Sequence, residues 1–396
     1  MFAKISQDTR LLISLFLPLF FIHCTAHVYL TYGGLLQRYE FSPEAIGWIL
    51  GIYFFAAMVS RPLAGWLLEN LGIRRVLVWS GIFNFVGCSL LFFNQSAMLL
   101  FIGRIISGAS FGVYTTGIFW HQAICVPKKT RGSMLSLLAV GGALSMATIT
   151  PLGEWFLLNS RETLYLALAP VLSLLCCFLG SRVSAAKTEE SSEKHSPGAN
   201  SWGSYSELFS TRPFLFLILT GWLVAFTDAI VINISLLAAE KGLVASYFIT
   251  SAAVVSVSVR LLGSSLLNVL PRVVLLAPCG ILMASSAILI SLFPSSGVFI
   301  AGGILFGVGI GAAWPMFLAL VADLLNPALL PKGTSTALLF YHGGLSMAPL
   351  FAGYFLPHLG TARTFIVMSL TVGAALVLLE ILYWLPFYWK SRSPQA

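Results

Sequence analysis

Long apolar runs separated by short polar turns extend from one end of the chain to the other. Each run holds roughly 20 residues, the length that an α-helix needs to cross the hydrocarbon core of a bilayer. No run shows the alternation of apolar and polar residues that is typical of transmembrane β-strands. The pattern predicts twelve transmembrane helices, near residues 11–36, 44–68, 75–94, 97–124, 132–157, 162–182, 214–239, 244–267, 273–293, 297–324, 334–357 and 362–387.

A polar segment at residues 183–213 interrupts this pattern. It has too few apolar residues to form a packed core, so we expect a flexible cytoplasmic linker. The chain would then consist of an N-terminal six-helix half (1–182), the linker (183–213) and a C-terminal six-helix half (214–396). The first apolar run follows Lys4 and Arg10, as in a signal peptide, but it continues to about Leu36 without a cleavage site. We interpret it as a retained helix.

Composition supports the same class: 58% of the residues are hydrophobic and only 9% are charged. Soluble domains carry about 25% charged residues, so the chain is predicted to be an all-α polytopic membrane protein. The net charge of +8 could suggest nucleic-acid binding, but its distribution argues against such a partner. With a cytoplasmic N-terminus, the Lys and Arg residues, Arg61 and Arg260 included, fall mostly on or near cytoplasmic segments, as the positive-inside rule requires. The exceptions are Arg38, Arg161, Lys241 and Arg363 outside and Arg104 within a helix. Both termini are therefore expected in the cytoplasm.

The chain lacks the usual sequence signatures of cofactor, metal and nucleotide sites. Its 6 cysteines lie in or at the ends of apolar runs, which implies no disulfide framework and no Cys/His metal site. No phosphate-binding Gly-x4-Gly-Lys-Ser/Thr motif occurs. We expect no cofactor, no metal and no ATP hydrolysis.

The two halves repeat. With a shift of 199 residues, Arg61 corresponds to Arg260, Gly108 to Gly307 and Gly112 to Gly311. With a shift of 201, Gly142-Ala-Leu-Ser-Met-Ala147 corresponds to Gly343-Gly-Leu-Ser-Met-Ala348. Parallel repeats of six helices are the layout in which a transported solute binds between the halves near the bilayer midplane.

A charged turn joins the second and third predicted helices, in the stretch from Arg61 to Arg75. Gly72 can adopt the positive φ of a sharp reversal, and two arginines at a turn suit a cytoplasmic membrane face. The notable positions are Gly65, Glu69, Gly72, Arg74 and Arg75.

This turn resembles the loop between helices 2 and 3 of the major facilitator superfamily, a large group of secondary transporters. Gly65, Leu67, Gly72 and Arg74 match the signature of that loop, with Glu69 at its usual Asp. Two departures, Asn70 and Ile73, replace usual arginines and would weaken the salt bridges attributed to this loop. The resemblance implies a twelve-helix transporter fold, with the loop acting in gating.

Helix 4 combines a cation with two glycines, in Arg104-x3-Gly108-x3-Gly112. The spacing puts both glycines on one face, where a neighbouring helix can pack closely; we expect the same of Gly307 and Gly311. An intramembrane arginine is costly and faces a cavity or a partner. Arg104 also resembles the helix 4 arginine of the superfamily's proton-coupled exporters, which implies proton coupling or anion contact. A structural ion pair is the alternative.

Helix 5 contains Gly142-x7-Thr150-Pro151-x-Gly153, which resembles the Gly-Pro signature of drug exporters. Thr150 replaces the glycine before the proline, so the resemblance favours export only slightly. A hinge or a close packing point is the favoured interpretation.

Asp228 is the strongest candidate for proton coupling or substrate contact. It lies near the middle of predicted helix 7, with no basic residue near it on that helix. An unpaired carboxylate in hydrocarbon tends to take up a proton, because desolvation penalises the anion. A carboxyl group that exchanges protons with either side is what proton coupling requires. The alternative is a protonated carboxyl group in a packing hydrogen bond.

Helix 1 carries His23 and His27, which are four residues apart and share a helix face. Such a pair could bind a ligand or relay protons. Without a third ligand a zinc site is not expected, and two interior histidines with only packing roles remain an equal alternative.

Other polar residues are weaker candidates. For Tyr32, Tyr53, Tyr114, Tyr341 and His342, packing is the default interpretation. We expect Glu154, Asp323 and Glu380, near helix ends, to reach the lipid headgroups.

The leading hypothesis is a monomeric secondary transporter in the inner membrane that exports a small molecule by alternating access, coupled to protons through Asp228 and Arg104. Proton symport of an organic acid or a sugar is the alternative. An integral membrane enzyme is disfavoured, because no nucleophile or metal motif occurs. A non-transporting receptor is disfavoured because no large soluble domain is present. The expected partners are a small-molecule substrate, protons and the lipid bilayer.

Overall fold

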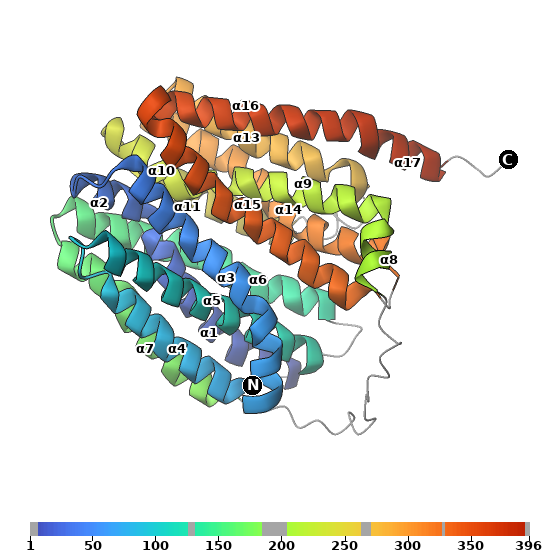
Figure 1. The fold of residues 1–396 in the computed structure, drawn as a ribbon, viewed down its shortest axis with the longest axis horizontal. Coiled ribbons are helices and arrows are strands. Elements are labelled where there is room, and N and C mark those ends of the chain that lie inside the picture. The colour runs from blue at the N-terminus through green and yellow to red at the C-terminus, as the bar shows by residue number, and fades with distance from the viewer. Residues whose placement is uncertain (1–6, 126–130, 184–203, 263–270, 327–328, 393–396) are drawn as a thin grey trace, which may run out of the picture.

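The computed structural model describes residues 7–125, 131–183, 204–262, 271–326 and 329–392, and these residues form helices and turns without a strand. Figure 1 shows long helices running side by side in two groups, with the N-terminal group below the C-terminal group. The helices of the first group are α1 (Gln7–His27), the 3₁₀ turn η1 (Val28–Thr31), α2 (Tyr32–Arg38), α3 (Pro43–Leu71), α4 (Ile73–Leu90), α5 (Ala97–Cys125), α6 (Arg131–Leu158) and α7 (Glu162–Arg182).

The second group begins with a short helix, α8 (Tyr205–Ser210), and continues to the C-terminus. Its members are α9 (Arg212–Asp228), α10 (Ile230–Glu240), α11 (Ala245–Leu262), η2 (Arg272–Val274), α13 (Leu276–Leu292), α14 (Ser296–Leu324), α15 (Leu330–Leu359), α16 (Thr361–Leu379), the π-helical turn η3 (Glu380–Trp384) and α17 (Leu385–Arg392). The predicted linker therefore contains helical residues at its end, with Leu208 of α8 fully buried. Most of the predicted linker lies outside the described residues.

Several helix ends follow from local sequence. Ser42 caps α3 by accepting a hydrogen bond from the N–H of Ala45 at 3.2 Å, and Pro43 occupies the first turn, where its missing N–H costs nothing. Gly72 ends α3 with a φ of 76°, the positive φ expected for this turn. The reversal lets α4 begin directly at Ile73.

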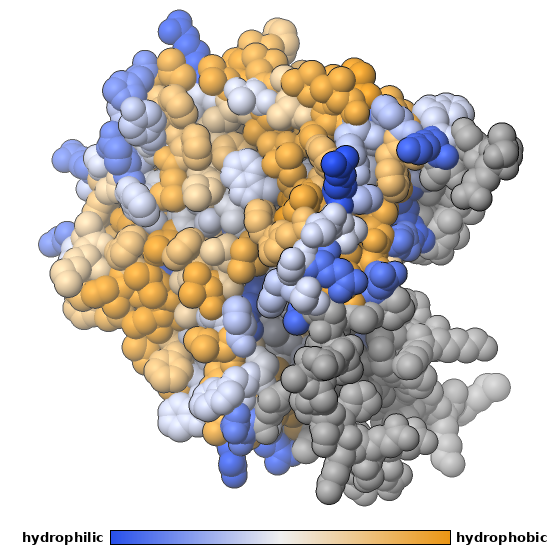
Figure 2. Space-filling model, turned by 45° about the vertical axis from the view of Figure 1, so that its right-hand side comes forward, coloured by the Kyte–Doolittle hydropathy of each residue, from blue (hydrophilic) through white to orange (hydrophobic). Residues whose placement is uncertain are grey.

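In the described part of the chain, nine helical stretches are long and apolar enough to cross a membrane. Large apolar side chains such as Trp48, Leu63 and Trp79 are exposed on their outer faces. In Figure 2, apolar residues cover most of the visible face, and many of the hydrophilic residues lie toward its edges. An exposed apolar belt of this extent suits contact with lipid acyl chains.

The sequence repeat is also a repeat of contacts. A Cβ on Gly108 of α5 would lie 2.2 Å from the backbone oxygen of Tyr53 on α3. A Cβ on Gly307 of α14 would lie 2.5 Å from the backbone oxygen of Ala252 on α11. Gly112 and Gly311 are placed in the same way, against Ala57 and Ser256. These glycines let the paired helices approach closely, and the two pairs correspond under the 199-residue shift.

The halves meet closely at the end of the bundle that holds α2 and α10, remote from the chain termini (Figure 1). There, a Cβ on Gly47 of α3 would lie 2.6 Å from the backbone oxygen of Pro349 on α15. Gly34 of α2 donates its N–H to the hydroxyl of Ser235 on α10 at 3.3 Å. The structure is therefore closed at this end.

Candidate functional site

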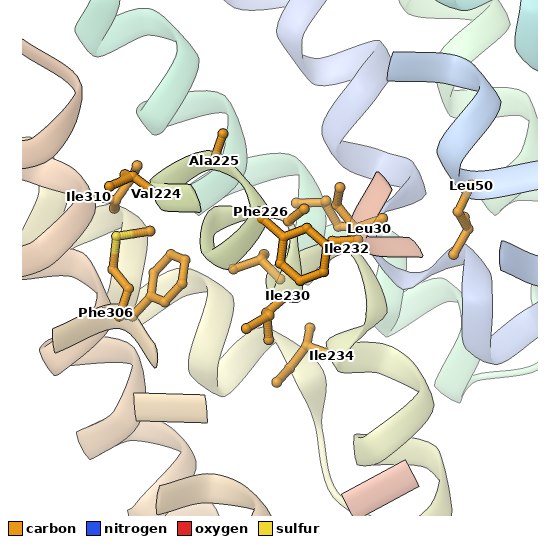
Figure 3. Packing of buried hydrophobic residues seen from close by; sticks show 14 of the residues in the cluster. Leu30, Leu50, Val224, Ala225, Phe226, Ile230, Ile232, Ile234, Phe306 and Ile310 are labelled. Atoms are coloured by element: carbon orange, nitrogen blue, oxygen red, sulfur yellow. The ribbon is translucent and has the colours of Figure 1, made fainter. Parts of the chain in front are cut away.

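Two predicted helices are interrupted at corresponding places. The first changes to 3₁₀ geometry at Val28–Thr31, and the seventh breaks at Ala229, between α9 and α10. Tyr29 and Asp228 lie 199 residues apart, so the interruptions are related by the repeat. The turn η1 and α2 lie against α10. Figure 3 shows Leu30 of η1 with Ile232 and Ile234 of α10, all three in one buried cluster. Both irregular turns therefore lie where the N-terminal half packs against the C-terminal half.

Asp228 lies at this break, where it is partly buried. Its carboxylate accepts a hydrogen bond from the hydroxyl of Tyr341 on α15 at 3.3 Å. Arg260 of α11 is close enough to interact with it electrostatically, but no ion pair within 4.0 Å forms. The Tyr341 ring packs edge-on against Trp314 of α14, 4.6 Å between centroids, which helps to fix its position. Asp228 therefore has a defined partner and a cation nearby.

Arg61 of α3 reaches across to the C-terminal half. Its guanidinium donates from Nη2 to Nε2 of His342 on α15 at 2.9 Å. Arginine has only donors, so Nε2 must accept, and the proton of the neutral imidazole is on Nδ1. That nitrogen donates to the carbonyl of Leu338 at 2.8 Å, which agrees with this assignment. Nη1 makes a longer contact of 3.4 Å with the hydroxyl of Thr116.

Arg260 of the C-terminal half reaches across to the N-terminal half. Its Nη1 donates to the carbonyl of Ala139 on α6 at 3.4 Å. Both arginines were expected on or near cytoplasmic segments. The structure places both at the boundary between the halves, and both Nε atoms are buried without a partner among the described residues.

The two histidines of the first helix lie next to each other, with ring centroids 5.7 Å apart. His27 donates from Nδ1 to the hydroxyl of Ser145 on α6 at 2.7 Å, and Ser145 in turn donates to the carbonyl of Gly142. His23 bonds through Nδ1 to the carbonyl of Leu19 at 2.8 Å and packs edge-on against Phe111. No group of three metal-ligating side chains occurs in the described parts of the chain.

Arg104 lies apart from Asp228, inside the N-terminal half. It is 2% exposed and donates from Nε to the carbonyl of Ile49 on α3 at 3.2 Å. Its guanidinium lies 4.2 Å from the ring centroid of Tyr53 and 5.3 Å from that of Tyr29. These contacts join η1, α3 and α5. Neither Asp228 nor the histidines are among the partners recorded for Arg104 in the described structure.

The turn between α3 and α4 begins after Leu71, where α3 ends. Gly65 lies inside α3, with no atom within 4 Å of its Cβ position. Arg74 is exposed and donates from Nε to the carbonyl of Val183, at the end of α7, at 3.3 Å. Arg75 is also exposed. The side chain of Glu69 lies outside the described residues.

The structure thus brings Asp228 together with Tyr341 and Arg260, and His23 with His27. Sequence reasoning missed Arg61, Arg260 and His342 as members of the site. The available signal was the 199-residue repeat, which aligns the two arginines within helices 2 and 8. His342 could not be paired with Arg61 by sequence alone, since 281 positions separate them.

A family profile described as Major Facilitator Superfamily matches residues 11–295 and 239–396. The chain belongs to this superfamily. The fold agrees: the crystal structure of a D-xylose-proton symporter superimposes with a TM-score of 0.75 at 14% identity, covering 93% of this chain and 96% of the other. A search of curated proteins found no match. As a member of the major facilitator superfamily, the protein is a multi-pass membrane transporter of small molecules and not an enzyme.

Proposed function

We propose that the protein is a proton-coupled transporter in which Asp228 carries the proton. Its position supports this role. Asp228 is a partly buried carboxylate at the break in the seventh helix, and it accepts a hydrogen bond from Tyr341 of α15, in the same half. A carboxyl group at the boundary between moving halves can exchange protons with one side and then the other. Its neutral hydroxyl partner allows both the ionised and the protonated carboxyl group.

Export is the direction that the sequence favours, through the resemblance of Gly142 to Gly153 to drug exporters. Symport is the second candidate. It is supported by Arg260 near Asp228, because a proton on Asp228 would leave this cation available to a solute that travels with the proton. The D-xylose-proton symporter has the same fold, which both directions share.

The remaining parts of the proposal concern placement in the membrane. We propose an inner-membrane monomer with two six-helix halves, and with both termini in the cytoplasm. Exposed Arg74 and Arg75 support this orientation, since cations favour the cytoplasmic face. The turn from Gly65 to Arg75 would act as a gate there, attached to the end of α7 through Arg74.

The test compares the growth media of cells that express the intact protein, Asp228→Asn, or Asp323→Asn, by untargeted mass spectrometry. Asp323 is a matched control, because it is a half-exposed carboxylate in a surface ion pair with Arg272. Compounds that change with the intact protein and the control but not with Asp228→Asn would support the proposal. Enrichment outside indicates export, and faster depletion indicates uptake. Gradient-driven transport by Asp228→Asn would exclude Asp228 as the proton carrier.

A further inference from the structure

We propose that the transported solute is an organic anion, and that its carboxylate binds between Arg61 and Arg260. This inference rests on the proposed transport function and names its substrate class. Four observations carry it: the symmetry of the two arginines, their lack of acidic partners, the balance of charge at the boundary between the halves, and the aromatic rings nearby.

The two arginines occupy equivalent places in the two halves. They lie 199 residues apart, on α3 and α11, and these helices pack in the same way on α5 and α14. Each guanidinium reaches across the boundary, one to His342 and the other to Ala139. Arg260 donates to Ala139 of α6, the helix whose Gly142 lies against His23. Arg61 contacts Thr116 of α5, the helix whose Phe111 packs on His23. Both guanidinium groups therefore bond to helices that contact His23. A solute there would contact both halves at once, as alternating access requires.

Neither guanidinium has an acidic hydrogen-bonding partner. Within the described residues, the two ion pairs are Lys241–Glu240 and Arg272–Asp323, and neither includes Arg61 or Arg260. The partners of Arg61 and Arg260 are a neutral imidazole, a hydroxyl and a carbonyl, with two of the three contacts at 3.4 Å. A buried cation is costly unless it is paired and fully hydrogen-bonded. The unused Nε donors therefore favour an anionic ligand, which guanidinium groups bind through paired N–H···O bonds.

The charge balance supports the same conclusion. Asp228 is the one acidic side chain near Arg260 in the described structure, and none lies near the guanidinium of Arg61. His342 adds no negative charge, since its Nε2 accepts from Arg61 as a neutral imidazole. The boundary therefore keeps an excess of positive charge even with Asp228 ionised.

The surroundings indicate an organic anion and not an inorganic one. Aromatic rings lie beside the polar groups: Trp314 packs on Tyr341, Phe111 packs on His23, and Trp222 lies 3.5 Å from the Cβ position of Gly343. Such rings can bury an apolar body while a few polar groups fix the orientation of the ligand. We therefore assign a carboxylate carried on an apolar or aromatic body.

Binding of such an anion would be linked to the proton. An ionised Asp228 and a bound carboxylate repel each other and compete for Arg260, so anion binding favours protonated Asp228. Linkage is reciprocal, and a proton on Asp228 then favours anion binding. Proton and anion would occupy the site together, so this inference favours symport, the second candidate above, over export.

The test measures binding to the purified full-length protein as a shift in Tm, at constant ionic strength. The probes are benzoate and succinate, their neutral analogues benzamide and succinamide, and inorganic phosphate. We expect a carboxylate to raise Tm and its amide to have no effect. Arg61→Gln and Arg260→Gln should each weaken the apparent affinity by about 10- to 100-fold, the range for lost charge-assisted hydrogen bonds. The control Arg161→Gln removes an equal charge at an exposed position and should keep the original affinity.

Several results would overturn the proposal: equal stabilisation by the amide, stabilisation by phosphate alone, no stabilisation by any anion, or unchanged affinity in both glutamine variants. If a glutamine variant fails to fold, Arg61→Lys or Arg260→Lys takes its place. Lysine keeps the positive charge but lacks the planar pair of N–H donors of a guanidinium, so a weaker affinity for the carboxylate at a normal Tm would support the site. These measurements need no gradient. A failure of the anion site is therefore distinguishable from a failure of proton coupling, which only the Asp228→Asn transport comparison tests.

Discussion

The carboxylate of Glu154 accepts a hydrogen bond of 2.7 Å from the backbone N–H of Ser246, across the boundary between the two halves. Its other oxygen accepts the N–H of Ala245 at the same distance. The first N–H groups of a helix lack intrahelical partners and carry partial positive charge, so a buried carboxylate is a strong cap for α11. The expectation that Glu154 reaches the lipid headgroups is wrong. It fastens α6 to α11 at the closed end of the bundle.

Replacing Glu154 with alanine should shift the protein toward states open at this end. The variant loses two charge-assisted hydrogen bonds that exist only while the halves are closed there. A loss of about 2 kcal/mol would change the ratio of closed to open molecules about 30-fold. Asn159 and Lys241 are exposed and lie in different halves. With spin labels at these two positions in an otherwise cysteine-free protein, double electron–electron resonance should give longer label-to-label distances for Glu154→Ala than for the unmodified sequence.

The matched control is Glu162→Ala, which removes a carboxylate at the same end without crossing the boundary. Glu162 accepts a hydrogen bond of 2.5 Å from the hydroxyl of Tyr39, in its own half. Burial and this hydrogen bond raise the pKa of Tyr39 to about 12, so the hydroxyl keeps its proton at neutral pH. The distance distribution should stay as in the unmodified protein. Equal shifts in both variants would contradict the role assigned to Glu154.

The positions of the helices could be predicted from the sequence, but their interruptions could not. Runs of about 20 apolar residues have few alternatives in a bilayer, so hydropathy locates them. The stretch Val28 to Thr31 and the break at Ala229 lie inside such runs and consist largely of apolar residues. Hydropathy has no signal for a change of helix geometry. These breaks depend on how η1 and α10 pack against each other, which is a tertiary property.

Candidate residues could be identified from the sequence where polar side chains interrupt an apolar run, as with Asp228 and the pair His23 and His27. It was missed where a cation also fitted the topology rule, as with Arg61 and Arg260. Their role depends on contacts across the boundary with His342 and Ala139. Such contacts join distant parts of the chain and are not encoded in local spacing.

Close packing between α3 and α5 predicts that Gly108→Ala destabilises the protein. The added Cβ would lie 2.2 Å from the backbone oxygen of Tyr53, a clash with an atom that cannot move without its helix. Overpacking of this kind costs about 1–3 kcal/mol or more, and Tm should fall by several degrees. Gly307→Ala should behave alike, since its Cβ meets Ala252 in the same way.

Gly65→Ala is the matched control on the same helix pair. No atom lies within 4 Å of its Cβ position, and alanine is favoured over glycine within a helix by about 1 kcal/mol. Its Tm should be unchanged or slightly higher. A fall as large as that of Gly108→Ala would show that helix contact is not the cause.

Arg104 should prove to be a structural residue, in contrast to the coupling role that its sequence position suggested. Arg104→Lys loses the Nε bond to the carbonyl of Ile49 and the contact of the guanidinium with the Tyr53 ring. Desolvated cation–π contacts are worth about 2 kcal/mol, so Tm should fall clearly. The folded fraction of Arg104→Lys should still transport by a proton-driven route that depends on Asp228, because the described contacts of Arg104 stay within the N-terminal half.

Arg182→Lys is the matched control, because it makes the same substitution at an exposed arginine that also lies near an aromatic ring. Arg182 is exposed, and its guanidinium lies 5.1 Å from the ring centroid of Phe178, a similar contact in solvent. Exposed cation–π contacts are worth about 0.5–1 kcal/mol, and this variant should show little change in Tm. The decisive comparison is between Tm and proton-driven transport in the Arg104 variant. A normal Tm with transport no longer driven by protons would restore Arg104 to the coupling machinery, because the packing contacts would then be dispensable.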